Sequence, residues 1–334
     1  MIELLKKNNE LWDLFTRTEE YNPEIFDKNK RFLYRYSKYQ HIFDPKVSEF
    51  LVKNGFKFQW PDNHKFAVCL THDIDNIYPS WKYRYFTSLK FATKFQWQKS
   101  LDRVSKKENP YWNFRRIISL EKKYDAKSSF YIMLDKSNYD AVELKDELIK
   151  IIDNSYEVGL HGGHQTYNDF NLMIREKEKL EEIAGKKIIG YRNHYLKFKI
   201  PDTWTLLYKA GFKYDTTLGY ADSVGFRNGM CHPFRPFDLN SGKQIDILEI
   251  PLTIMDSTLL QYMHLNVEES WQICKKLINT VRDLGGVVTI LWHNSYFDEI
   301  YRRGWEKLYE KILKYCYEKN AWMTTGQNIW KLIN

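Results

Sequence analysis

The chain has 334 residues, of which 43% are hydrophobic and 28% charged, a balance typical of a globular protein that buries a core. Its formal net charge of +8 comes mainly from scattered lysines, and no compact basic run indicates a nucleic-acid-binding tail. No stretch approaches the roughly 20 apolar residues that span a bilayer. These properties argue against a nucleic-acid-binding protein and against a membrane-spanning one.

The first 60 residues are charged, rich in aromatic side chains and mostly helix-like, so we expect a helical N-terminal extension over residues 1–60. The opening residues, Met1 to Lys7, lack the apolar stretch of a signal peptide. The four cysteines are far apart, fit no paired metal spacing and are expected to be packed free thiols. They are Cys69, Cys231, Cys274 and Cys316. Together these features predict a cytoplasmic protein.

From Phe66 onward, short apolar runs alternate with amphipathic segments, which indicates parallel βα units. Strands are predicted at Phe66–Leu70, Lys127–Met133, Tyr156–Leu160, Lys187–Tyr191, Ile245–Leu252 and Val287–Leu291. Helices are predicted at Pro110–Lys123, Leu144–Ile152, Asp169–Ile183, from Pro201, Val267–Leu284 and Tyr301–Lys319. The basic, aromatic segment 78–109 is expected to be an insertion. Six or seven such units over residues 61–334 predict an irregular α/β barrel.

Four polar fragments each lie at the end of one of these strands. They are Thr71–Asp75, His161–Gln165, Arg192–Tyr195 and Leu291–His293. Because α/β barrels build their active sites from residues at the carboxyl ends of the strands, we expect the four fragments to meet in one site.

The first fragment carries two carboxylates, Asp73 and Asp75. Residues two apart on an extended chain face the same way, so both can point into one pocket. Two close carboxylates raise each other's proton affinity unless a cation sits between them. One can then bind a metal while the other takes a proton from water. The alternative is that one of them only caps the following turn.

The second fragment places His161 and His164 around a Gly-Gly pair. Imidazoles three residues apart can share a divalent cation, and glycine lets the backbone bend to allow it. His161, which directly follows the strand, is the stronger candidate. Gln165 competes with His164 for the same place, although side-chain amides are poor zinc ligands.

The other two fragments supply a cation and a titratable imidazole. Arg192 can pair with a carboxylate and hold it ionised. His293 can act as a general acid because the pKa of histidine lies near neutral pH. An ordinary salt bridge for Arg192 and a hydrogen-bonded rim position for His293 are the structural alternatives.

The fragments resemble the motifs of the NodB-type polysaccharide deacetylases, carbohydrate esterase family 4, over residues 64–334. That family has a distorted (β/α)7 barrel and uses a divalent metal, often zinc, to remove acetyl groups from N- or O-acetylated sugars. Its Thr-Phe-Asp-Asp motif resembles Thr71–Asp73, with the second aspartate displaced to Asp75. The resemblance makes Asp73 the catalytic base and Asp75 a metal ligand. The Leu-x-His motif matches Leu291–His293, with His293 as the general acid.

The family's other motifs match only in part. His-x-x-x-His matches at His161, but its second histidine falls on Gln165, and His164 is one residue early. Arg-x-Pro-Tyr matches Arg192–Tyr195 with His194 at the proline position, so the third metal ligand is open among His164, His194 and Gln165. The resemblance also makes Arg192 the partner of the base and the N–H of Tyr195 part of the oxyanion hole. The fourth motif has no assigned copy, although Asp215 and Asp256 lie in the right part of the chain.

The resemblance therefore implies a zinc-dependent hydrolase that deacetylates a sugar or glycan precursor. The net charge of +8 could favour an anionic precursor, and it could equally be a solvated surface. The aromatic residues Trp292, Tyr220 and Phe226 are candidates to stack on sugar rings, and core packing explains Trp292 about as well. One alternative is a degenerate domain that binds carbohydrate without catalysis. Another keeps the barrel and the metal but cleaves a different bond, as a deformylase or a cyclic-amide hydrolase.

Overall fold

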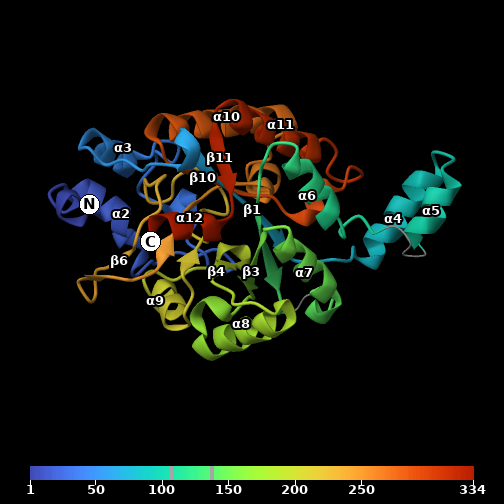
Figure 1. Ribbon diagram of the computed structural model, residues 1–334, viewed down its shortest axis with the longest axis horizontal. Helices are drawn as coiled ribbons and strands as arrows, with labels where there is room; N and C mark the ends of the chain where they lie inside the picture. The colour runs from blue at the N-terminus through green and yellow to red at the C-terminus, as the bar shows by residue number, and fades with distance from the viewer. Residues whose placement is uncertain (105–108, 136–138) are drawn as a thin grey trace.

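A curled parallel sheet forms the centre of the computed structural model, which describes residues 1–104, 109–135 and 139–334 (Figure 1). Within those ranges nine strands run in the order β8-β5-β4-β3-β2-β1-β10-β9, and β11 pairs with β1. Their bounds are β1 (Phe66–Ile74), β2 (Ser129–Met133), β3 (Glu157–Gly162), β4 (Gly190–Asn193), β5 (Tyr214–Asp215), β8 (Leu248–Glu249), β9 (Leu252–Met255), β10 (Val287–Leu291) and β11 (Ala321–Thr324). A separate hairpin joins β6 (Phe237–Asp238) to β7 (Lys243–Gln244).

One continuous segment connects the two ends of the sheet. Its first part, β8, pairs with β5, and its second part, β9, pairs with β10. Between them the N–H of Ile250 donates to the carbonyl of Asp215 at 2.9 Å, and the N–H of Leu252 donates to that of Leu218 at 3.0 Å. The sheet therefore curls round into the distorted (β/α)7-type barrel that the family resemblance implies.

Helices surround the sheet on its outer side (Figure 1). They are α6 (Phe114–Lys122), α7 (Lys145–Asp153), α8 (Phe170–Ala184), α9 (Asp202–Lys209), α10 (Val267–Leu284) and α11 (Trp305–Glu318). The ends of α10 show how the sequence fixes such a helix. Asn266 and Glu269 form a capping box at its start, and Gly285 ends it with a left-handed φ of 69°. The predictions for α10 and β10 are confirmed to the residue.

The amino end of the barrel is closed by α12 (Gly326–Ile333), which the sequence analysis missed together with β11. Ile329 of α12 packs inside the barrel with Tyr131 and Tyr214. At the start of α12, the N–H of Gln327 donates to the buried carboxylate of Glu157 at 2.9 Å. Helix N-termini favour negative charge, so α12 both covers the barrel end and stabilises this carboxylate.

Two glycines make room for the tyrosines inside the barrel. A Cβ atom on Gly159 would lie 2.5 Å from the ring of Tyr131, and one on Gly190 would lie 2.2 Å from the hydroxyl of Tyr214. Any side chain at either position would collide with a ring, because interior atoms are already close-packed. These glycines therefore fix where the two rings lie beneath the active site.

The N-terminal segment packs directly on the barrel. It contains α1 (Ile2–Leu5), α2 (Asn9–Thr16) and α3 (Lys46–Lys53), and residues 21–45 are irregular apart from one short 3₁₀ turn, so the segment is less helical than predicted. Leu14 and Phe15 belong to the same hydrophobic core as the barrel helices. The backbone N–H of Tyr34 donates to Asp222 at 2.8 Å.

Several predicted bounds are wrong for identifiable reasons. The predicted strand Ile245–Leu252 is divided into β8 and β9 because Pro251 has no N–H to donate. Strand β4 begins at Gly190, three residues later than predicted, and α11 begins at Trp305 after a loop. The predicted insertion 78–109 contains α4 (Trp81–Ala92) and α5 (Trp97–Val104), with residues 105–108 outside the described residues. Within the described ranges, no helix is both long and apolar enough to cross a bilayer.

Candidate active site

The predicted polar residues lie around one pocket at the carboxyl ends of the strands. This pocket of about 230 Å³ is lined by residues that include Asp73, Asp75, His161, His194 and His293. Asp73 lies on β1, Asp75 directly follows it, and His161 lies on β3, while His194 follows β4. Fragments separated by more than 200 residues therefore share one site, at the barrel end where α/β barrels place their chemistry.

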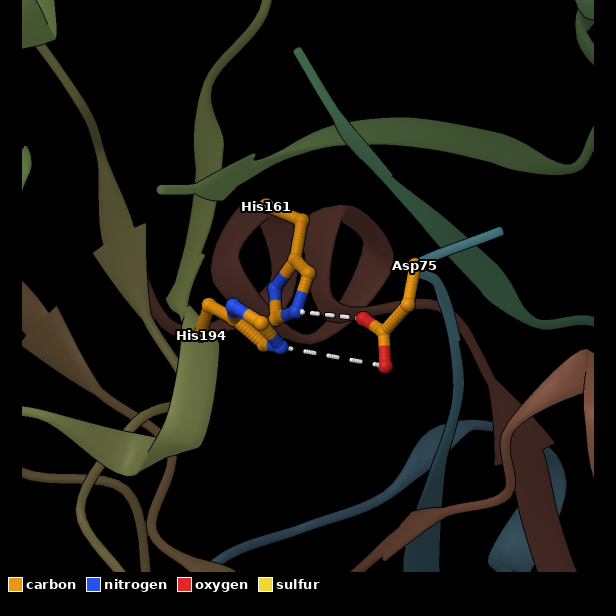
Figure 2. Close-up of side chains that lie close together, drawn as sticks. All are labelled: Asp75, His161 and His194. Atoms are coloured by element: carbon orange, nitrogen blue, oxygen red, sulfur yellow. Dashed lines mark ion pairs between the residues drawn. The ribbon is translucent and has the colours of Figure 1, made fainter. Parts of the chain in front are cut away.

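Asp75, His161 and His194 point toward one another and form the candidate metal group (Figure 2). Each offers a ligand atom within 4.8 Å of the others. His161 Nε2 lies 3.1 Å from Asp75 Oδ1, and His194 Nε2 lies 3.9 Å from Asp75 Oδ2. Two ligand atoms of a tetrahedral zinc ion, each about 2.1 Å from it, are about 3.4 Å apart. The observed separations are close to that value.

The donor atoms of this group also have the right chemistry for a cation. His161 Nδ1 lies 3.2 Å from the carbonyl oxygen of Arg192, which can only accept, so Nδ1 carries a proton and Nε2 is the ring nitrogen that faces the group. His161 Nε2 and Asp75 Oδ1 are buried and, although 3.1 Å apart, are not aligned as a hydrogen bond. Two imidazoles and a carboxylate suit zinc and related divalent ions. The residues present therefore fit a divalent cation.

The electrostatics of the group favour an added positive charge. Burial would raise the pKa of Asp75, but His161 first and then His194 hold it below its ordinary value. Burial would lower the pKa of His161, but the carboxylates of Asp73 and Asp75 outweigh burial and raise it. Burial lowers the pKa of His194 to about 4, so this imidazole is neutral near pH 7 and available as a ligand.

The other two candidates for the third ligand lie elsewhere. His164 is half-buried and its ring packs edge-on against His194, with the ring centroids 4.8 Å apart. Its backbone N–H donates to Asp135 at 3.3 Å. Gln165 is exposed. In the part of the chain that the structure describes, neither joins the group of three, and His194 is the histidine that lies beside Asp75 and His161.

Asp73 and Arg192 face each other next to the metal group. Asp73 Oδ1 lies 3.8 Å from Arg192 Nη1, and Asp73 Oδ2 lies 3.6 Å from His161 Nε2. Arg192 is fully buried, its Nε donates to the hydroxyl of Thr216 at 3.1 Å, and its guanidinium lies 5.2 Å from the ring centre of Tyr131. The buried guanidinium of Arg192 therefore faces the Asp73 carboxylate from a fixed position.

His293 is held by a residue that the sequence analysis left unassigned, Asp256. The Asp256 carboxylate lies 2.7 Å from His293 Nδ1 and accepts the backbone N–H of His293 at 2.6 Å. His293 Nε2 then faces Asp75 Oδ2 at 3.8 Å. Burial would lower the pKa of His293, but Asp256 raises it to about 10, so the imidazole is protonated near neutral pH. Asp256 directly follows the apolar run of β9, the same signal that marked the other fragments.

The turn after β4 is stabilised by the N-terminal segment. Tyr195 and Leu196 have φ values of 60° and 54°, which side-chain-bearing residues rarely adopt. Arg31 is buried, donates to the carbonyl of Tyr195 at 3.2 Å and to the hydroxyl of Tyr262 at 3.1 Å, and is itself held by Asp27. Residue 31 thus belongs to the pocket, which no local sequence signal indicated.

Three residues expected to stack on sugar rings lie in the core instead. Trp292, Tyr220 and Phe226 are at most 5% exposed. Trp292 packs against Trp305, with the ring centroids 5.8 Å apart. Their burial has a simple physical reason, because a large aromatic side chain stabilises the fold when it is buried, whether or not a sugar is bound.

Two other polar residues near the motifs also have structural surroundings. His72 points away from the pocket, and its Nε2 lies 2.8 Å from the buried carboxylate of Glu121. Asp215, the other unassigned aspartate, accepts the hydroxyl of Thr217 at 2.6 Å and interacts electrostatically with buried Glu249. Asp256, and not Asp215, therefore reaches the site. The four cysteines are buried free thiols.

Solved structures share this fold. No family model matches the sequence, and no curated protein is significantly similar to it. The structure is similar to a polysaccharide deacetylase from Mycobacterium smegmatis, with a TM-score of 0.57 and 19% identity. It is similar to the PuuE allantoinase and to a polysaccharide deacetylase from Pseudomonas aeruginosa PAO1, each with a TM-score of 0.57 and 15% identity. Each alignment covers 82% of this chain and 92% of the other. The predicted fold is therefore confirmed as that of the polysaccharide deacetylases.

Proposed function

We propose that this protein is a metal-dependent deacetylase that hydrolyses the N-acetyl or O-acetyl group of a sugar or glycan precursor. One observation supports this above all others. A buried carboxylate, Asp73, and an imidazole protonated near neutral pH, His293, each lie within 4 Å of the candidate metal group. Hydrolysis of an amide needs a base for the attacking water and an acid for the departing amine, and these two residues supply both.

The metal group would be Asp75, His161 and His194, for which zinc is the expected ion. A divalent cation bound there supplies Lewis acidity toward water and the acyl carbonyl. Asp73 accepts the proton of the attacking water, and the guanidinium of Arg192 faces its carboxylate with Nη1 3.8 Å from Oδ1. The N–H of Tyr195 is the proposed donor to the oxyanion, a contribution on the order of 3 kcal/mol.

His293 completes the reaction as the acid. Asp256 fixes its tautomer by contact with Nδ1, so Nε2 is the atom that delivers a proton to the leaving amine or alcohol. Asp256 therefore acts as a positioning residue through His293. Its carboxylate is fully buried behind His293.

A second candidate is hydrolysis of a different amide, supported by the similarity to an allantoinase at the same TM-score. The base, the acid and the metal group would serve a cyclic amide equally well. Acetate release distinguishes the two candidates, because opening of a cyclic amide releases no acetate.

The decisive experiment combines metal analysis with the Asp73→Asn variant. We expect about one zinc or related ion per chain in both proteins. We also expect that only the parent releases acetate from acetylated sugars, because the side-chain amide at position 73 of the variant cannot accept the proton of the attacking water. Metal bound without turnover on acetylated sugars or cyclic amides would instead favour the non-catalytic carbohydrate-binding alternative. Near-normal turnover in Asp73→Asn would remove Asp73 as the base.

A further inference from the structure

Helices α4 and α5 form a hairpin that stands away from the barrel (Figure 1). The two helices meet through small residues, with the hydroxyls of Ser88 and Ser100 2.7 Å apart. Both serines are buried, although they lie in the projecting hairpin. The helices therefore bury small side chains between them and leave their large ones outside.

The outward face of the hairpin is unusually apolar. Among the described residues, seven of the eighteen large hydrophobic side chains that are exposed lie between positions 81 and 101. We call these seven residues the apolar set: Trp81, Tyr85, Phe86, Leu89, Phe95, Trp97 and Leu101. Trp81 is 73% exposed and Phe95 is 82% exposed. A concentration of this kind on one projecting element marks an interaction surface.

The same element is strongly basic. Residues 78–104 contain six Lys or Arg and one Asp. Lys82, Lys90, Lys94 and Lys99 are exposed. Pairing of two copies about a two-fold axis would bring these equal charges together, which disfavours a second copy as the occupant. Aromatic and aliphatic side chains interleaved with lysines match the headgroup region of an anionic bilayer.

The hairpin is attached to the rim of the catalytic pocket. The ring of Tyr83 lies 4.7 Å from that of Tyr301, and Lys90 Nζ donates to the carbonyl of Ile300 at 3.2 Å. Arg302, in the same loop, lines the pocket that contains Asp73 and His293. A surface that binds the hairpin therefore lies beside the pocket.

We propose that the α4–α5 hairpin binds the surface of an anionic lipid bilayer. The apolar set enters the headgroup region, and the lysines contact lipid phosphates. The protein then lies on the membrane without spanning it, with the catalytic pocket next to the bilayer. The binding site and its ligand are separate from the proposed catalysis, so either can fail without the other.

The test is flotation of the full-length protein with vesicles of phosphatidylcholine, with and without about one third phosphatidylglycerol. Trp81→Ser/Trp97→Ser/Leu101→Ser removes three exposed side chains and should weaken binding to the anionic vesicles by about tenfold or more. Tyr208→Ser/Tyr317→Ser is the matched control, since these residues are 50% and 57% exposed on other helices. It should bind as the parent does, and all variants should keep the parent's thermal melting curve.

A charge-reversal pair tests the electrostatic half of the proposal. Lys94→Glu/Lys99→Glu should also weaken binding by about tenfold, and the parent's binding should weaken as salt is added. The control Lys145→Glu/Lys209→Glu changes exposed lysines on other helices and should have little effect. The proposal is overturned if the parent does not bind anionic vesicles, if it binds both vesicle types equally, or if both hairpin variants bind anionic vesicles as well as the parent does. Hairpin-dependent self-association without vesicle binding would assign the surface to a second copy.

Discussion

His194→Ala should remove one of three ligands from the proposed metal group, and the structure allows the effect to be estimated. The imidazole of His194 is buried, neutral near pH 7 and 3.9 Å from the Asp75 carboxylate. Its removal leaves Asp75 and His161 as the only members of the group. The family's matching position is proline, so the sequence offered His194 only as one of three alternatives for the third ligand.

The magnitude follows from the number of ligands. Structural zinc sites with four ligands bind with about 10–16 kcal/mol, so one ligand contributes on the order of 3 kcal/mol. A loss of that size weakens metal binding by roughly 100-fold. The change should occur without unfolding, because His194 lies at the pocket and not in the core cluster.

The assay is competition for zinc against a chelator of known affinity, with His164→Ala as the matched control. His164 packs against His194 but is not a member of the metal group, so its removal should change affinity by less than about tenfold. The assignment would be refuted if His164→Ala bound zinc weakly while His194→Ala bound it with nearly the parent's affinity. Unchanged affinity in both would mean that Gln165 or water completes the site.

Three further predictions concern buried polar contacts. Arg31→Gln should lower kcat by about tenfold with metal content and KM retained, because the Tyr195 turn loses its clamp; unchanged kinetics would exclude this role. Glu121→Ala should lower the free energy of unfolding in urea by about 3–5 kcal/mol, because buried donors lose their acceptor; a change near zero would contradict this. Burial first and then Asp215 raise the pKa of Glu249 well above 4.5, so the folded chain keeps a proton that the unfolded chain loses. The stability then falls as the pH rises above the ordinary pKa of glutamate, and Glu249→Gln should flatten that fall in thermal melts.

The sequence predicted the barrel because each strand is a buried apolar run. The run before Asp73 and the run before His293 were both recognisable, and polar residues directly after them must lie at the carboxyl ends of parallel strands. Local patterns of this kind also fixed both ends of α10, where Asn266 and Gly285 have definite capping roles.

The rest depended on contacts that no local pattern contains. That His194 and not His164 lies in one group with Asp75 and His161 depends on the turn after β4, where Tyr195 has a φ of 60° that local sequence does not predict. Asp256 escaped assignment because the strand before it was placed too early. Arg31 reaches Tyr195 across 164 positions of sequence, which only the packing of the N-terminal segment on the barrel brings about.

The position of Arg192 is determined by hydrogen bonds inside the barrel as well as by contacts in the pocket. Beneath it, the hydroxyl of Tyr131 accepts from Thr216 at 3.2 Å and donates to the hydroxyl of Tyr214, and Tyr214 in turn donates to buried Glu157 at 2.6 Å. Thr216 also accepts from Arg192. A chain of hydrogen bonds therefore runs through the barrel interior from Glu157, near the end that α12 closes, to the guanidinium of Arg192 at the pocket. Its Nη atoms have no hydrogen-bond partner and are buried, which leaves the Asp73 carboxylate as the charge they face. A lysine would keep the charge but lack the Nε donor and the planar face, so this site requires arginine.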